Sequence, residues 1–138
     1  MSGFTLHERL AGDTVAVTDG PLSAIRLMND RSYPWLILVP QRPDLREMHD
    51  LAASERTQLM AEIAAASRCL ETLFNADKIN VGALGNLVPQ LHIHVIARFR
   101  NDPAWPGPVW GAAPPEPYEP GDLAARAEAL RDALHQEF

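Results

Sequence analysis

The sequence is poor in three features that would each point to a particular class of protein: cysteine, long hydrophobic runs and clusters of basic residues. Its one cysteine, Cys69, has no partner for an internal disulfide, so we interpret it as a small buried hydrophobic residue. The strongest apolar run, residues 35–39, is far shorter than the roughly 20 residues that span a bilayer. Residues 1–13 also lack a basic start followed by an apolar stretch. We therefore expect a cytoplasmic protein without a membrane segment.

The charge balance excludes a second class of protein. The chain has 12 Lys and Arg residues against 18 Asp and Glu residues, which gives a net charge of −6. Affinity for DNA or RNA in general comes largely from clustered basic residues that displace counterions, and no such cluster is present. A single nucleotide is still compatible with this composition, because backbone N–H groups and a few donors can hold a small anion.

The length and the hydrophobic periodicity predict the fold class. A chain of 138 residues fits one domain, which we expect to span residues 1–138. The pattern predicts an α+β fold, in which a five-stranded antiparallel sheet carries one long helix and short terminal helices. The predicted strands are residues 15–20, 23–30, 35–40, 78–84 and 90–99, and the predicted helices are residues 4–14, 54–74 and 122–138. Ser54 is the expected N-cap of the long helix.

Residues 101–121 form a segment of unusual composition that holds most of the 12 prolines together with Trp105 and Trp110. Proline lacks a backbone N–H, which excludes a helix interior or a central strand here. We expect this Pro/Trp arm to run in an extended conformation and its tryptophans to cover apolar surface of their own subunit. The alternative is that the arm reaches over the active site of a partner copy.

The most informative stretch is VPQLHIHVI, residues 88–96, which places two of the five histidines one residue apart. Side chains alternate between the two faces of a strand, so Gln90, His92 and His94 are expected on one face. The aliphatic residues between them would then face the core. A strand that needed only a polar face could carry threonine there, so the paired imidazoles suggest a chemical role.

Three interpretations of this polar row are open from the residues alone. The first is a half-exposed polar surface with ordinary histidines. The second is a metal site on His92 and His94, although the other three histidines and Cys69 offer no evident further ligand. The third is a nucleophile: a neutral imidazole attacks phosphorus well when an acceptor holds its second nitrogen and nearby donors neutralise the phosphoryl oxygens.

The segment QLHIHVI resembles the signature of the histidine triad family, His-x-His-x-His with aliphatic x, except that Gln90 takes the first histidine position. The similarity extends over residues 23–98, where AIRLMND, LILVPQRP, MHDL, the long helix and INVGALGN occur in the order of the family. The chain is most similar to the fragile-histidine-triad branch of nucleotide hydrolases. The resemblance implies an enzyme that needs no metal or other cofactor and forms a homodimer through the long helix and an edge strand.

The resemblance also implies the reaction and its central residues. His92 would attack the α-phosphorus of a nucleoside phosphoanhydride or phosphoramidate and form a transient nucleotidyl-histidine, which water then hydrolyses to a nucleoside monophosphate. His94 would hydrogen-bond the phosphate oxygens. Asn29 matches the residue that binds the ribose hydroxyls of the nucleotide.

Four further positions match residues that line the family's nucleotide pocket. Ile25 and Leu27 lie where the base pocket is lined, with core packing as the alternative role for both. Asn80 and Asn86 match amides that face the phosphates, and their alternative role is to support turns of the backbone.

Three residues depart from the family pattern. Gln90 cannot donate a proton as an imidazolium does, so the way in which the leaving group is protonated would differ. Trp35 stands where relatives often have Gly-His, which would remove a polar group from the pocket, and Leu87 replaces a small hydroxyl residue. These departures favour either an altered choice of substrate or weak activity. The competing hypothesis is therefore a nucleotide-binding protein on the same fold with little or no catalysis.

Overall fold

The computed structural model describes residues 3–138, so Met1 of the expected domain and its neighbour Ser2 lie outside the described residues. It confirms the α+β fold with a five-stranded antiparallel sheet. The elements are α1 (Glu8–Asp13), β1 (Thr14–Asp19), β2 (Ser23–Met28), β3 (Trp35–Pro40), a 3₁₀ turn η1 (Met48–Asp50), α2 (Ala53–Phe74), β4 (Lys78–Gly82), β5 (Ile93–Arg98) and α3 (Pro120–His135). The strand order β1-β2-β3-β5-β4 puts β5 between β3 and β4.

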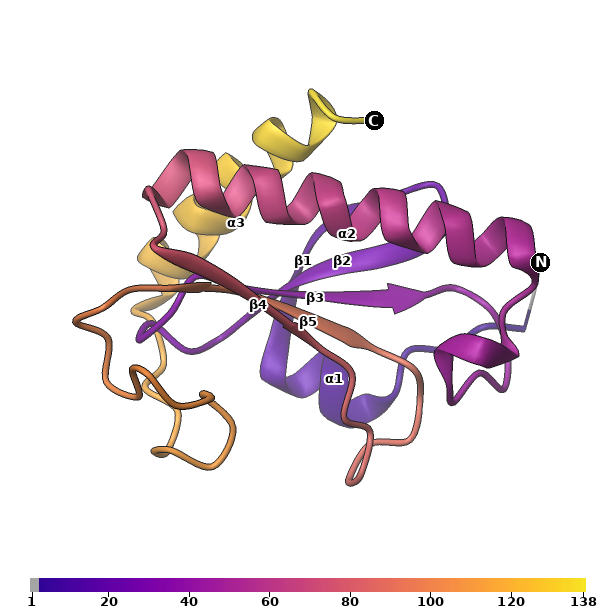
Figure 1. Ribbon diagram of the computed structural model, residues 1–138, viewed down its shortest axis with the longest axis horizontal. Helices are drawn as coiled ribbons and strands as arrows, with labels where there is room; N and C mark the ends of the chain where they lie inside the picture. Colours follow the sequence, from indigo (N-terminus) through magenta and orange to yellow (C-terminus); the bar gives the residue numbers. More distant parts are fainter. Residues whose placement is uncertain (1–2) are drawn as a thin grey trace.

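The two faces of the sheet are covered by different parts of the chain, as Figure 1 shows. The long helix α2 lies across one face with α3 beside it, and their buried leucines pack against Leu38, Ile93 and Val95 of the strands. On the other face, α1 and the Pro/Trp arm cover a second apolar cluster around Trp35 and Ile37. Alternate residues of one strand therefore pack either under α2 and α3 or under α1 and the Pro/Trp arm. No helix in residues 3–138 is long and apolar enough to cross a membrane.

The sequence predicted that the long helix starts at Ser54 as its N-cap, but the N-cap is Ala52 and α2 begins at Ala53. The capping interaction comes from Glu55, whose carboxylate accepts a hydrogen bond of 3.2 Å from the backbone N–H of Ala52. The helix ends at Phe74, and its C-cap, Asn75, adopts the left-handed conformation with φ 53°.

The terminal helices are also shifted from their predicted bounds. The first begins only at Glu8, because His7 is its N-cap and accepts a hydrogen bond from the N–H of Arg9 through Nδ1. The last begins at Pro120 rather than at residue 122, since the missing N–H of proline costs nothing in the first turn of a helix.

The fifth strand is shorter than predicted, and this matters for the site. It was expected to begin at Gln90, but β5 begins at Ile93. Just before it, the N–H of Leu91 donates to the carbonyl of Leu45 in the connector instead of to a neighbouring strand. Gln90 and His92 therefore belong to the loop that enters β5, and only His94 lies within the strand.

Candidate active site

His92 is held by its own backbone in one tautomer. Its Nδ1 lies 2.7 Å from the carbonyl oxygen of Gln90, and only 7% of the residue is exposed. Because a carbonyl oxygen can only accept, Nδ1 carries the proton of the neutral ring. Nε2 is then left with its lone pair, which is the form that a nitrogen nucleophile needs.

His94 is held in the opposite tautomer by Trp35. The indole Nε1–H of Trp35 donates to Nδ1 of His94 over 3.0 Å. An indole N–H can only donate, so Nδ1 is the acceptor and Nε2 carries the proton. Burial of the ring, followed by the proximity of His92, lowers the pKa of His94 to about 4. The ring is therefore neutral at physiological pH and presents an N–H donor.

Together the two rings place an acceptor and a donor side by side. Their centroids lie 5.0 Å apart at an interplanar angle of 65°. A lone pair on Nε2 of His92 next to an N–H on Nε2 of His94 is suited to nucleophilic attack at phosphorus, with the donor neutralising charge on a phosphoryl oxygen. In residues 3–138, no group of three or more His, Cys, Asp and Glu side chains is arranged to hold a metal ion.

Two indoles contact His94, one from each side of β5. Trp35 comes from β3, with its ring 5.6 Å from the imidazole between centroids, and Trp110 comes from the Pro/Trp arm at 5.3 Å. Trp110 lies directly on β4, where a Cβ on Gly82 would meet its indole at 2.9 Å. The expectation that Trp35 removes a polar group from the pocket is wrong, because its N–H bonds the histidine.

A cavity of about 480 Å³ opens beside these indoles. It lies between the end of α1, the turn after β2 and the Pro/Trp arm, and its lining includes Met28, Asn29, Tyr33, Trp35 and Trp110. Asn29 lines this cavity, and its Oδ1 accepts a hydrogen bond from the N–H of Tyr118. Apolar and aromatic walls with a few polar groups are typical of small-molecule sites.

The Gln90 side chain is bonded to the N-terminal segment. Its Oε1 accepts a hydrogen bond from the N–H of His7, and its Nε2 donates to the carbonyl of Thr5, both over 2.8 Å. The amide thus ties the N-terminal segment to the loop before β5. Of the predicted row, only the two histidines lie together.

Ile25 and Leu27 do not line the nucleotide side of the sheet. They are 1% and 0% exposed and pack in the cluster under α2. Register explains the placement, since Leu27 pairs with the helix-facing Leu36 of β3. His94 and the cavity lie on the opposite face, so the expected role of Ile25 and Leu27 in the base pocket is wrong; Met28 of the same strand lines the cavity.

The two predicted amides have different surroundings. Asn80, on β4, accepts a hydrogen bond of 2.7 Å from Nη1 of Arg98 through Oδ1. Asn86 is exposed in the loop between β4 and β5. Asn80 is therefore part of a buried polar network, whereas Asn86 is open to a ligand.

Sequence reasoning missed the residues that shape the site from far away in the chain. Trp110 was expected only to cover apolar surface, Trp35 was expected to remove a polar group, and Arg98 was not singled out. One signal was available for Arg98, because it lies four residues after His94 and so shares its face of the strand. The local sequence pattern could not predict the Trp35–His94 hydrogen bond, because its partners are 59 residues apart.

We expect Trp35→Phe to slow turnover while leaving the fold intact. Phenylalanine keeps an aromatic ring but removes the N–H that fixes the tautomer of His94, so the donor on Nε2 is no longer enforced. Loss of one aligned donor of this kind should cost about 10-fold or more in kcat. Steady-state kinetics would show this, with Tyr118→Phe, whose ring lies outside the cavity lining, as the control; equal kinetics for both variants would contradict the role of Trp35.

We expect the stability of the folded protein to fall as the pH is lowered from 6.5 to about 4. In this range the unfolded chain protonates His94 at its ordinary pKa of 6.5, while the folded chain keeps it neutral to a pKa of about 4. Protons therefore favour the unfolded state, by about 1.4 kcal/mol for each pH unit. Urea unfolding at several pH values measures this slope, and His94→Asn should flatten it. An unchanged slope in that variant would rule out His94 as its source.

Gln90→Ala tests whether the amide acts in catalysis or in structure. Its two bonds to the N-terminal segment predict a loss of about 1–3 kcal/mol in stability and a rate close to that of the wild type. Thermal melting and kinetics on the same preparation would separate the two roles. A large fall in rate without a fall in melting temperature would assign Gln90 to the reaction.

Comparisons with known proteins identify the family of the chain. The profile of the HIT domain family matches residues 10–101. The chain is 32% identical over 72 residues to the asymmetrical bis(5′-nucleosyl)-tetraphosphatase of Schizosaccharomyces pombe, a match that spans 49% of this chain and 39% of that protein.

Two solved bacterial structures match nearly the whole chain. The histidine triad protein of Bradyrhizobium japonicum is 46% identical, with a TM-score of 0.92 over 95% of this chain and 98% of that one. The histidine triad protein of Marinobacter aquaeolei VT8 is 47% identical, with a TM-score of 0.94 over 98% of both chains. With the family profile also matching well over half of its residues, the chain belongs to the HIT domain family.

Proposed function

We propose that the protein is a nucleotide hydrolase or nucleotidyl transferase that acts at the α-phosphate of a nucleoside phosphoanhydride or phosphoramidate, without a metal. Nε2 of His92 attacks the α-phosphorus and forms an N–P bond as the bond from phosphorus to the leaving group breaks. Water then attacks the nucleotidyl-histidine, which releases a nucleoside monophosphate and restores the neutral imidazole. In a transferase, another acceptor takes the place of water.

The observation that carries this proposal is the opposed tautomers of the two histidines. The Gln90 carbonyl leaves a lone pair on Nε2 of His92, and Trp35 leaves a proton on Nε2 of His94. A purely structural pair would not need one acceptor and one donor next to each other. The cavity at Asn29 offers a place for the nucleoside, and the exposed Asn86 is free to meet a phosphate.

The family gives the proposal its substrate class. The Schizosaccharomyces pombe relative is named as a tetraphosphatase of bis(5′-nucleosyl) compounds, which are phosphoanhydrides of two nucleosides. We propose a dinucleoside polyphosphate-like substrate by this likeness, and a place for the chain near the fragile-histidine-triad branch. The alternative is a weakly active or inactive nucleotide-binding protein, which is favoured because the Gln90 amide cannot act as an acid and is bonded to Thr5 and His7.

One experiment separates the enzyme from the binding protein. The purified protein is incubated with a chelator and a panel of dinucleoside polyphosphates and nucleoside phosphoramidates, while intact protein mass and nucleoside monophosphate release are recorded. An adduct of one nucleotidyl group with matching product would support the enzyme. Saturable binding of a nucleoside monophosphate with no adduct and no product across the panel would support the binding protein.

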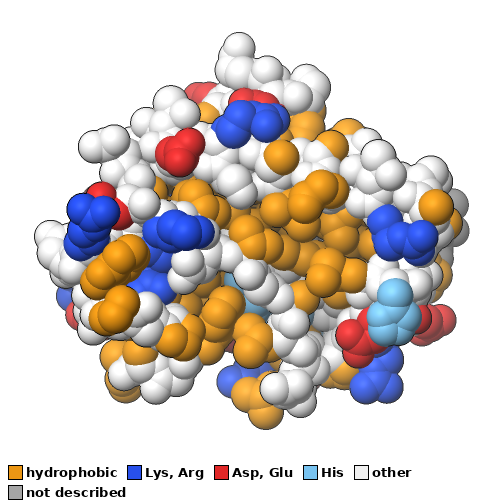
Figure 2. Space-filling model, in the orientation of Figure 1, with side chains coloured by type: hydrophobic (Ala, Val, Ile, Leu, Met, Phe, Trp, Pro, Cys, Tyr) orange, Lys and Arg blue, Asp and Glu red, His pale blue; other side chains and the backbone are white. Residues whose placement is uncertain are grey.

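We further propose that the protein forms a homodimer through α2 and the edge strand β4. Figure 2 shows hydrophobic side chains spread across the middle of the face on which these two elements lie. Met60 and Leu73 of α2 and Val81 of β4 are 58%, 44% and 49% exposed, and the outer edge of β4 is unpaired among the described residues. Sedimentation of the wild type beside Val81→Lys tests this, because a charge in the interface should favour the monomer.

A further inference from the structure

The Pro/Trp arm lies beyond the residues that the HIT domain profile matches, yet it forms a wall of the site. The profile ends at residue 101, and Trp110 follows nine residues later. Trp110 contacts the ring of His94 and also lines the 480 Å³ cavity that contains Asn29. A nucleotide with its phosphate at the histidines and its nucleoside in this cavity would therefore pass along the Trp110 indole.

Trp110 has a polar group that the protein itself does not satisfy. Its Nε1–H is buried and has no hydrogen-bond partner among residues 3–138. A buried indole N–H normally has a partner, because leaving a donor without one costs free energy. A ligand in the adjoining cavity can supply the acceptor. Gly82 leaves room for the ring on β4, since any larger residue there would push it away.

The arm is fixed to the end of β5 by a buried ion pair. Asp102 bonds Arg98 through Nε at 2.8 Å and Nη2 at 3.0 Å, and the two side chains are only 3% and 2% exposed. The same carboxylate accepts hydrogen bonds from the N–H groups of Phe99, Ala104 and Trp105. Burial opposes ionisation of Asp102, but the bonds from Arg98, Phe99 and Trp105 outweigh it and lower the pKa of the carboxyl group.

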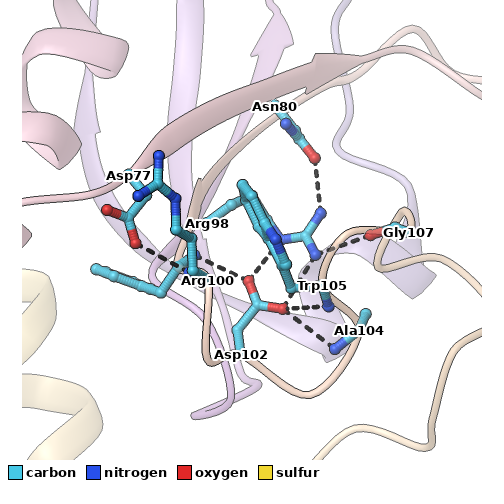
Figure 3. Close-up of polar contacts among 9 residues, drawn as sticks. Asp77, Asn80, Arg98, Arg100, Asp102, Ala104, Trp105 and Gly107 are labelled. Carbon is cyan, nitrogen blue, oxygen red and sulfur yellow. Dashed lines mark hydrogen bonds and ion pairs between the residues drawn. The ribbon is translucent and has the colours of Figure 1, made fainter.

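Figure 3 shows that the Arg98 guanidinium is at the centre of this network. Besides Asp102 it donates to Oδ1 of Asn80 on β4 at 2.7 Å and to the carbonyl of Gly107 in the arm at 2.8 Å. The ring of Trp105 lies over it, with 5.8 Å between the guanidinium carbon and the ring centroid. Arg98 thus joins β5, β4 and the arm just three residues before Trp110.

We propose that Trp110 is a nucleotide-contacting, specificity-determining residue, which lies against the nucleobase and donates its Nε1–H to the bound nucleotide, and that Arg98 and Asp102 are the positioning residues that hold it there. This inference rests on the proposed function, since it needs a nucleotide in the cavity. It extends the site into a part of the chain that the family profile leaves unassigned.

The indole of Trp110 indicates which chemical class of ligand this side of the cavity would bind. An indole offers a flat apolar face that stacks on any nucleobase, and such stacking is worth enough to change affinity about 10-fold or more. A ribose phosphate without a base cannot use that face. Trp110 should therefore discriminate between a nucleotide and a base-free sugar phosphate, and it should have little influence on the phosphate end.

The test is calorimetric binding of adenosine monophosphate and of ribose 5-phosphate to wild type and variants. We expect Trp110→Ala to weaken adenosine monophosphate about 10-fold and ribose 5-phosphate hardly at all. Trp110→Phe should give an intermediate loss, because it keeps the ring and removes the N–H. Phe138→Ala, which removes an exposed aromatic ring outside the cavity lining, is the control and should bind like the wild type.

Asp102→Asn tests the positioning role with the same two ligands. We expect it to lower the affinity for adenosine monophosphate in the same selective way, with circular dichroism confirming that the variant is folded; a folded variant that binds like the wild type would overturn the role of the ion pair. If this variant does not fold, the comparison of Trp110→Phe and Trp110→Ala still decides the role of the indole.

The outcomes separate this inference from the proposed function. Wild type that binds adenosine monophosphate, with Trp110→Ala unchanged or equally weakened for both ligands, would overturn the inference and leave the function standing. Wild type that binds no nucleotide and turns over none of the panel would overturn the proposed function, and the inference with it.

Discussion

His92→Ala is expected to abolish turnover and the nucleotidyl adduct together. The alanine side chain removes the only Nε2 lone pair that the Gln90 carbonyl orients, so no N–P bond can form at this position. We expect the rate of nucleoside monophosphate release to fall by about 10³-fold or more. Binding of a nucleoside monophosphate should persist, because the cavity at Asn29 does not include His92 in its lining.

The matched control is His135→Ala. This histidine is exposed near the end of α3 and bonds Oγ1 of Thr18, so its loss removes an imidazole without touching the site. Intact-mass spectra of the three proteins after incubation with substrate give the result directly. An adduct of unchanged mass and yield in His92→Ala would show that another group is the nucleophile.

Asp102→Ala is expected to be the most destabilising single substitution discussed here. It leaves the Arg98 guanidinium buried without its carboxylate and removes the acceptor of three backbone N–H groups. Breaking a buried ion pair by removing one partner costs about 3–5 kcal/mol of stability. Urea unfolding of wild type and variant at pH 7 measures the change in the free energy of unfolding.

An exposed ion pair of the same chain provides the control. Arg68 and Glu137 approach to 2.7 Å, but their side chains are 59% and 26% exposed. Glu137→Ala should therefore cost less than about 1 kcal/mol. Equal losses of stability for the two variants would contradict the importance of burial. Combining Asp102→Ala with Arg98→Met should recover part of the lost stability, because it removes the unpaired buried charge.

Much of the fold follows from local sequence patterns. The 3.6-residue period of the long helix and the fully apolar run of β3 gave their elements directly, because helix and strand periodicities are properties of a short stretch of chain. The alternation of residues 90–96 likewise indicated a strand and paired histidines. The ordered motifs of residues 23–98 indicated the family. The bounds were less accurate, as at the start of α2, where the N-cap is Ala52 and the capping hydrogen bond is made by Glu55.

The faces of the strands were not decided by the pattern alone. Alternation in β2 shows that Ile25 and Leu27 share a face, but it does not say whether that face meets a helix or a nucleotide. The register of β2 with β3 and the position of α2 decide this. The partners of Gln90 were also beyond the reach of the pattern, because its side chain bonds residues more than 80 positions away in the chain.

By itself, the sequence determined the α+β architecture, the family and the two histidines, because these depend on residue types and spacings within single elements. Only the tertiary structure decided which nitrogen of each histidine carries the proton, since the Gln90 carbonyl and the Trp35 indole must first be brought to them. It also decided that the Pro/Trp arm closes one side of the site, because the Arg98–Asp102 pair that holds the arm gains its strength from burial. Contacts of this kind depend on packing between distant segments, which no local pattern records.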